Sequence, residues 1–175
     1  GPRPDMAVAV MSATLEISGL RDYMGASCRV LEAHGRQYPV ETVYRAPRLV
    51  SDGRGRVSPP PVWEQAADAV KEAVKDDGCG DVLVFMPGVY EIRKTAELLA
   101  GRPWMGGRDV FPLYGALTPE QQNRAVEQGK TPRVIVSTNV AETSLTIEGV
   151  RTVIDSGLVR RSGWDPYRGM DTLHL

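Results

Sequence analysis

The sequence is poor in cysteine, histidine and aromatic residues, and it carries almost no net charge. Cys28 and Cys79 stand far apart without a C-x-x-C spacing, and the chain has two histidines, His34 and His174. These residues support neither a zinc site nor a disulfide framework. The 21 basic and 22 acidic residues give a net charge of −1, which excludes a strong overall attraction to nucleic acid. Any contact with phosphate must therefore be local.

Long hydrophobic runs are also lacking. No apolar stretch approaches the roughly 18 residues of a membrane span, and the N-terminus lacks the shape of a signal peptide. Together with the cysteine usage, this predicts a cytoplasmic protein without a membrane partner. Gly1-Pro2 resembles the remnant of a protease site, so we expect the native sequence to begin near Arg3.

The motifs of nucleotide hydrolysis are missing as well. The sequence has no G-x-x-x-x-G-K-[ST] loop, no paired acidic motif for magnesium and no nucleophile with a neighbouring histidine. The chain therefore lacks the parts to hydrolyse a nucleotide by itself. We expect no complete catalytic site and no metal site within it.

Short apolar runs predict the strands of a sheet. Runs that are apolar at consecutive positions favour strands covered on both faces, as in a parallel sheet. The predicted strands are residues 7–11, 29–31, 40–44, 82–86, 110–114, 133–137 and 151–154.

Helical patterns alternate with these strands. Apolar residues at a spacing of three and four predict a helix at residues 62–75, and two more are expected at residues 91–99 and 119–127. The last begins with Thr118 as N-cap and Gln121 at the third helical position. The alternation predicts an α/β fold with an open, mostly parallel sheet and helices on both faces, which binds ligands at the carboxyl ends of its strands.

Two further segments flank this pattern. Residues 158–161 and 170–175 predict a C-terminal β-hairpin around a turn at residues 164–169. Residues 47–61 are polar and rich in glycine and proline, which predicts a surface loop without chemistry of its own.

A dense run of short polar side chains follows the strand at residues 133–137. Hydroxyl and amide groups can donate hydrogen bonds to phosphate oxygens without the reach of lysine or arginine. If residues 141–145 turn helically, their first backbone N–H groups also face an anion. The alternative to a phosphate contact is that these short polar side chains only cap a helix, and composition alone favours this interpretation. The run contains Thr138, Asn139, Ser144, Thr146 and Glu148.

Three more segments place small residues at predicted strand ends. Ser12, Ala13 and Thr14 follow the first strand, a Pro-Gly turn at residues 87–88 follows another, and Gly115 follows a third. Gly115 would let its backbone approach a ligand closely. Each of these segments taken alone is also compatible with an ordinary turn.

Taken together and in this order, these segments resemble the DEAH-box subgroup of superfamily 2 RNA helicases, and most closely the bacterial HrpB-like proteins. Residues 12–14 resemble motif III, residues 82–92 motif IV, residues 112–124 the element IVa and residues 137–149 motif V. Residues 36–44 are similar to the stretch that opens the second RecA-like lobe. The resemblance leaves out only residues 47–61 and 101–108.

The resemblance implies a RecA-like fold and a part of an ATP-dependent RNA helicase. Residues 3–26 would be the end of the first lobe with motif III and a linker, and residues 27–175 the second lobe, ending before motif VI. In this family two lobes close on ATP and Mg²⁺ while single-stranded RNA runs across both. The implied partners are RNA and the first lobe and C-terminal domains of the same chain, and this fragment alone would hold no cofactor.

The motif positions imply three groups of residues. The residues that would couple the nucleotide state to movement of the lobes are Ser12, Ala13 and Thr14. Those that would contact RNA are Thr138, Asn139, Ser144 and Gly115. Those that would contact the nucleotide are Thr146, Glu148 and Val126.

Two of these positions depart from the family's pattern. The family has aspartate where this chain has Glu148, and eukaryotic members present an aromatic ring where it has Val126. An aliphatic residue offers less stacking to the base, which implies weak selectivity among nucleoside triphosphates. Two other interpretations stay open: a related translocase of this superfamily that acts on DNA, and a RecA-like module without enzymatic activity whose partner is a protein.

Overall fold

A computed structural model describes residues 8–11, 17–25, 28–31, 38–51, 53, 55–138, 147–165, 167 and 170–174. The chain divides into two compact units, Gly1–Tyr44 and Arg45–Leu175, which are described separately. The predicted boundary at residue 27 falls inside the first unit and stays a prediction. No helix in the described part of the chain is long and apolar enough to cross a membrane.

The described part of the first unit forms one helix and no strand. The helix, α1 (Ile17–Met24), was not predicted. The strands predicted at residues 7–11, 29–31 and 40–44 are wrong where those residues are described. Met11, Leu31 and Tyr44 are each at least 90% exposed. An apolar run becomes a strand only when another strand takes up its backbone hydrogen bonds, and the described residues of this unit show no such pairing.

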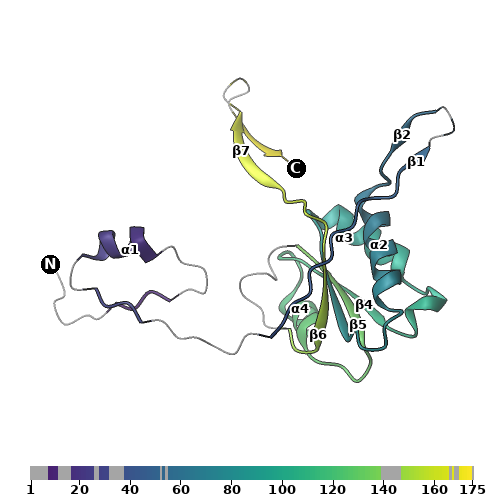
Figure 1. The fold of residues 1–175 in the computed structure, drawn as a ribbon, viewed down its shortest axis with the longest axis horizontal. Coiled ribbons are helices and arrows are strands. Elements are labelled where there is room, and N and C mark those ends of the chain that lie inside the picture. The colour runs from purple at the N-terminus through teal and green to yellow at the C-terminus, as the bar shows by residue number, and fades with distance from the viewer. Residues whose placement is uncertain are drawn as a thin grey trace. The chain divides into compact units, whose positions relative to one another are not determined.

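The second unit is built on a parallel sheet of four strands (Figure 1). The strands are β3 (Asp81–Phe85), β4 (Asp109–Leu113), β5 (Arg133–Ser137) and β6 (Val150–Asp155), and their order is β4-β5-β3-β6. The register pairs Val84 with Val136 and Leu113 with Ser137. The sequence predicted all four strands, and the bounds of β5 agree fully. Because every strand runs in the same direction, all carboxyl ends lie at one edge of the sheet and all amino ends at the other.

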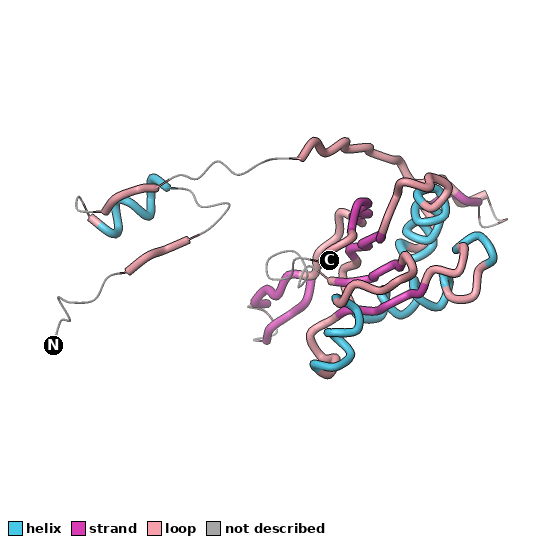
Figure 2. The backbone as a smooth tube through the Cα atoms, turned by 90° about the horizontal axis from the view of Figure 1, so that it is seen from below, coloured by secondary structure: helices cyan, strands magenta, loops and turns pink. Residues whose placement is uncertain are grey.

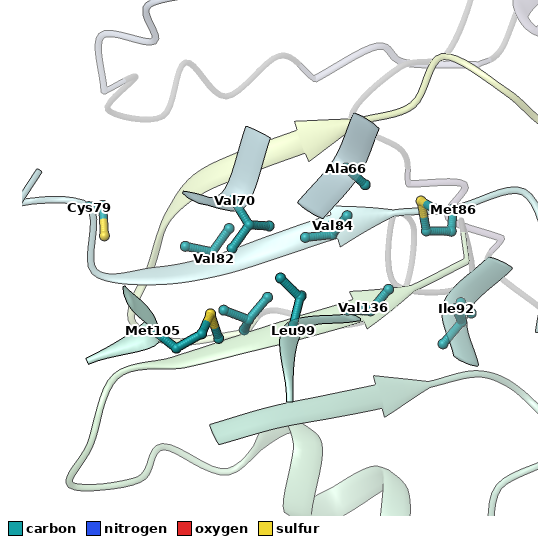
Figure 3. Close-up of a cluster of buried hydrophobic side chains, with 11 residues drawn as sticks. Ala66, Val70, Cys79, Val82, Val84, Met86, Ile92, Leu99, Met105 and Val136 are labelled. Carbon is teal, nitrogen blue, oxygen red and sulfur yellow. The ribbon is translucent and has the colours of Figure 1, made fainter. Parts of the chain in front are cut away.

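Helices cover both faces of this sheet, as predicted. Alternate residues of a strand point to opposite faces. Val82, Val84, Val134 and Val136 pack with residues of α2 (Val62–Ala73) and α3 (Val89–Leu99), as Figure 3 shows for most of them. Leu83 and Ile135 pack on the other side with Ala125 of α4 (Pro119–Val126). Each fully buried aliphatic side chain contributes about 1.5–3 kcal/mol, so this unit has a core of its own. A short 3₁₀ helix, η1 (Pro103–Met105), lies between α3 and β4.

Two hairpins complete the second unit (Figure 2). The predicted C-terminal hairpin is confirmed as β7 (Arg161–Asp165) paired antiparallel with β8 (Met170–His174). The loop predicted at residues 47–61 instead contains a short hairpin. Its strands, β1 (Val50–Ser51) and β2 (Val57–Ser58), have two residues each. The high glycine and proline content of this segment predicted a loop, and it gave no indication that the residues on either side of the turn pair as strands.

Candidate nucleic-acid and nucleotide edges

Two of the predicted RNA-contact residues leave the sheet at the same edge. Thr138 follows β5 and Gly115 lies two residues beyond β4, and the last residues of these strands, Leu113 and Ser137, are paired. Thr138 is half-buried, and its carbonyl oxygen accepts a hydrogen bond from the Ser137 hydroxyl at 2.9 Å. Gly115 is exposed, and a Cβ atom added there would meet no atom within 4 Å. This carboxyl edge therefore offers a hydroxyl residue and an accessible backbone side by side.

Positive charge stands at the same edge. The Arg93 guanidinium on α3 donates a hydrogen bond of 3.4 Å to the hydroxyl of Tyr114, the residue before Gly115. This hydrogen bond raises the pKa of Arg93 above its ordinary value, with a further contribution from the charge interaction with Tyr114. Arg93 is exposed and stays protonated at any physiological pH. A cation, an open backbone and a hydroxyl residue are the groups that bind a phosphodiester without reading its bases.

An ion pair joins the start of α3 to the segment between β6 and β7. Arg160 donates to the Glu91 Oε1 atom at 2.8 Å, and the Glu91 side chain is 9% exposed. The other carboxylate oxygen, Oε2, is buried and makes no hydrogen bond within the described structure. A Cβ atom at Gly88 would lie 2.9 Å from that oxygen. The absence of a side chain at position 88 thus lets the Pro-Gly turn close over the carboxylate.

The opposite edge is organised around a buried ion pair that the sequence did not suggest. Asp81 opens β3 and Arg133 opens β5, and both are buried. The Arg133 Nε atom donates to Asp81 Oδ2 at 2.8 Å, and its backbone N–H donates to Asp81 Oδ1 at 3.1 Å. Two contacts on one carboxylate fix the register of these neighbouring strands as well as their charge balance.

Arg133 also joins the two described residues for which the resemblance predicts nucleotide contact. Its Nη2 atom donates to the carbonyl oxygens of Val126 at 3.0 Å and of Glu148 at 3.5 Å, and its Nη1 atom donates to the carbonyl oxygen of Glu127. Val126 is half-buried, whereas Glu148 is exposed. Both residues therefore lie at the amino edge, since Val126 ends α4 and Glu148 stands just before β6.

This placement corrects one expectation. Parallel sheets bind ligands at the carboxyl ends of their strands, and the sequence placed the polar run that contains Thr138 and Glu148 at such an end. The segment that resembles motif V begins at the carboxyl end of β5 and ends at the amino end of β6. Its first and last residues, Thr138 and Glu148, are consequently at opposite edges. The candidate RNA and nucleotide residues form two separate groups.

The remaining candidates lie outside the described residues and stay predictions. They are Ser12, Ala13, Thr14, Asn139, Ser144 and Thr146. The described residues contain no group of three or more potential metal ligands. Where the structure describes them, Cys28 and Cys79 are free thiols, and Cys79 is buried.

A sequence signal for the buried pair did exist. Asp81 and Arg133 are charges of opposite sign, and each begins a run that is otherwise almost wholly apolar. A charged residue is rarely buried unless it is paired. Two such runs in one predicted sheet therefore point to a pair, although the sequence does not say that the two strands are neighbours.

Comparisons with known proteins identify this arrangement. The fold is that of a RecA-like lobe. The solved structure of Escherichia coli DEAH/RHA helicase HrpB matches it with a TM-score of 0.72 at 37% identity, over 93% of this chain and 20% of that one. The helicase conserved C-terminal domain family matches residues 65–171. The chain belongs to this family.

Curated relatives carry the same assignment. The ATP-dependent RNA helicase HrpB of Escherichia coli is 37% identical over 181 residues, which cover 99% of this chain and 20% of that protein. The pre-mRNA-splicing factor ATP-dependent RNA helicase prp22 of Schizosaccharomyces pombe is 35% identical over 178 residues, which cover 98% of this chain and 14% of that protein. The resemblance to DEAH-box helicases is thereby confirmed. The chain spans one fifth or less of the length of these two relatives.

Proposed function

We propose that this chain is the second RecA-like lobe of an ATP-dependent, HrpB-like RNA helicase that couples nucleotide hydrolysis to movement on RNA. The carboxyl edge, with Thr138 and Gly115 beside Arg93, carries this proposal. Small polar groups that contact phosphates and leave bases unread suit a protein that must release its strand at every step. The relatives' names support RNA over DNA as the substrate.

The amino edge fits a nucleotide at its sugar and base. The exposed carboxylate of Glu148 can accept hydrogen bonds from ribose hydroxyls, and the half-buried Val126 offers an apolar contact to a base. Nucleotide and Mg²⁺ would supply the reacting phosphoanhydride and its charge neutralisation, and the residues that bind the phosphates would come from other parts of the full-length protein. This chain's contribution is to orient the nucleoside and to hold RNA. We further propose a cytoplasmic location, consistent with its free thiols.

The primary test is Thr138→Ala in the full-length gene product. We expect RNA-stimulated ATP hydrolysis to fall at least about tenfold, because the variant loses one charge-assisted hydrogen bond to the RNA phosphate. Hydrolysis without RNA and the melting temperature should stay unchanged. Thr131→Ala is the matched control, because Thr131 is exposed near the amino end of β5. Unchanged RNA stimulation in Thr138→Ala would remove this residue from the RNA contact.

A second experiment separates the substrates. Hydrolysis of ATP, GTP, CTP and UTP by the full-length protein is measured with single-stranded RNA, with single-stranded DNA and without nucleic acid. Similar turnover of all four nucleotides is expected from the aliphatic Val126. Stimulation by DNA alone would favour the DNA translocase, and no hydrolysis under any condition would favour a protein-binding module.

A further inference from the structure

An exposed aromatic ring stands at the start of α3. Tyr90 is the second residue of this helix and is 56% exposed. The residues that α3 buries are Glu91, Ile92, Thr95 and Leu99. The core of the second unit therefore does not account for the ring of Tyr90.

A second aromatic residue fixes the orientation of this ring. α2 and α3 pack against each other (Figure 1), and the rings of Trp63 and Tyr90 meet edge to face, with centroids 5.5 Å apart and planes at 86°. In such a pair the edge of one ring covers one face of the other. At least one face of the Tyr90 ring is therefore left uncovered by Trp63. The contact also holds the ring in place before any ligand binds, which lowers the cost of binding.

Tyr90 belongs to the same carboxyl edge as the candidate RNA residues. α3 follows the turn at the end of β3, and its Arg93 reaches the hydroxyl of Tyr114, the residue before Gly115. Residues three positions apart are neighbours on the surface of a helix, so Tyr90 and Arg93 stand side by side. Both are exposed. The ring therefore extends the edge that we assign to RNA.

Arg93 gives this surface a partner for phosphate. Lys94, the next residue, is paired with Glu97 at 3.1 Å, whereas Arg93 donates to a neutral hydroxyl. A guanidinium keeps its charge at any physiological pH. An aromatic face beside such a cation suits a single strand, because its bases are free to stack while its phosphates meet the charge.

We propose that Tyr90 is a stacking platform for one base of single-stranded RNA, with Arg93 at a neighbouring phosphate. Every base has a flat π-face, so stacking adds affinity without sequence preference. The carboxyl edge would thus contact the bases as well as the backbone, without reading the sequence. This inference rests on the proposed function and extends its RNA site.

The experiment compares two strands that differ only in their bases, bound to the full-length protein. The probes are a fluorescein-labelled oligo(U) of about 20 nucleotides and a strand of equal length whose ribose units carry no base. Fluorescence anisotropy gives both affinities. In Tyr90→Leu we expect the affinity for oligo(U) to fall roughly tenfold, the effect of losing one stacked base. The affinity for the strand without bases should stay unchanged, and so should the salt dependence, because no charge is removed.

Three further variants make the result specific. Tyr90→Phe keeps the ring and should retain the affinity for oligo(U). Tyr23→Leu removes another exposed tyrosine, from α1, and should leave both affinities unchanged. Arg93→Gln should weaken both strands, with a slope of log affinity against log salt shallower by about 0.7.

Three results would overturn the stacking assignment. They are an unchanged affinity of Tyr90→Leu for oligo(U), an equal loss of that variant on both strands, and a loss in Tyr90→Phe as large as that in Tyr90→Leu.

The outcomes also separate this inference from the proposed function. If RNA stimulates hydrolysis while Tyr90→Leu binds oligo(U) as the unaltered protein does, the stacking platform is excluded and the helicase function stands. If RNA neither binds to the unaltered protein nor stimulates its hydrolysis, both are overturned.

Discussion

The two edges of the sheet differ in how tightly their residues are held. At the amino edge, Arg133 contacts an aspartate and three carbonyl oxygens, and the ion pair is buried. At the carboxyl edge, Gly115 has open space around it and Thr138 is half-buried. Under the proposed function, the amino edge orients a nucleoside and needs fixed geometry, whereas the carboxyl edge takes and releases a strand and needs accessible groups. Mutations should therefore act on stability at the first edge and on ligand binding at the second.

The largest effect is expected from breaking the ion pair at the amino edge. Asp81→Ala leaves the buried Arg133 guanidinium without its carboxylate, which should lower the free energy of unfolding by about 3–5 kcal/mol. Urea unfolding followed by tryptophan fluorescence measures this loss. Asp109→Ala is the matched control, because Asp109 also opens a strand but is exposed, and its effect should stay within about 0.5 kcal/mol. A loss below about 1 kcal/mol for Asp81→Ala would contradict the importance of the pair.

Backbone geometry beside this pair gives the next effect. Gly149 has a φ of +90°, and a Cβ atom there would lie 3.1 Å from Asp81 Oδ2. Arg133 holds this carboxylate, so it cannot move aside. Gly149→Ala should cost more than the 1–2 kcal/mol of a left-handed residue alone. Gly157→Ala is the control, because Gly157 has a φ of +68° and open space around it. Equal losses of unfolding free energy in the two variants would show that the Asp81 carboxylate moves away from the added Cβ atom.

A smaller loss is expected where α4 begins. The Thr118 hydroxyl accepts a hydrogen bond from the Gln121 backbone at 3.4 Å, and the Gln121 side chain accepts one from the Thr118 N–H at 3.1 Å. Thr118→Ala removes half of this capping box and should cost about 1 kcal/mol in urea unfolding. Gln121→Glu keeps the box and should change stability little. The start of α4 lies at the carboxyl edge, because α4 follows β4. If Thr118→Ala cost more stability than Asp81→Ala, the carboxyl edge would be the more tightly held of the two.

The sequence predicted local features better than contacts between distant residues. The capping box at Thr118 and the bounds of β5 are confirmed, because each depends on a few consecutive residues. The pair of Asp81 and Arg133 was missed because 52 residues separate its members. Only the order of the strands brings them together, and alternating strands and helices do not specify that order.

The same reason explains both errors of placement. The apolar runs at residues 29–31 and 40–44 satisfy the pattern of a strand, but the pattern does not provide a neighbouring strand. Thr138 and Glu148 were grouped because they are close in sequence, yet the connection between β5 and β6 carries them to opposite edges. Proximity along the chain predicted proximity in space wrongly where a parallel crossover intervenes.

The smallest change in stability, and the sharpest comparison of the edges, comes from Gly115→Ala. Gly115 has no positive φ and no atom within 4 Å of an added Cβ, so the free energy of unfolding should change by less than about 0.5 kcal/mol. If RNA approaches this backbone closely, the added methyl group should weaken oligo(U) binding several-fold by contact with the strand. Gly129→Ala is its counterpart near the amino edge, since Gly129 has an ordinary φ and its nearest neighbour to an added Cβ is 3.7 Å away. That variant should leave both stability and RNA binding unchanged. Equal RNA affinities for the two variants would mean that the strand does not pass over Gly115, and the proposed RNA contact at this edge would then rest on Thr138 and Arg93.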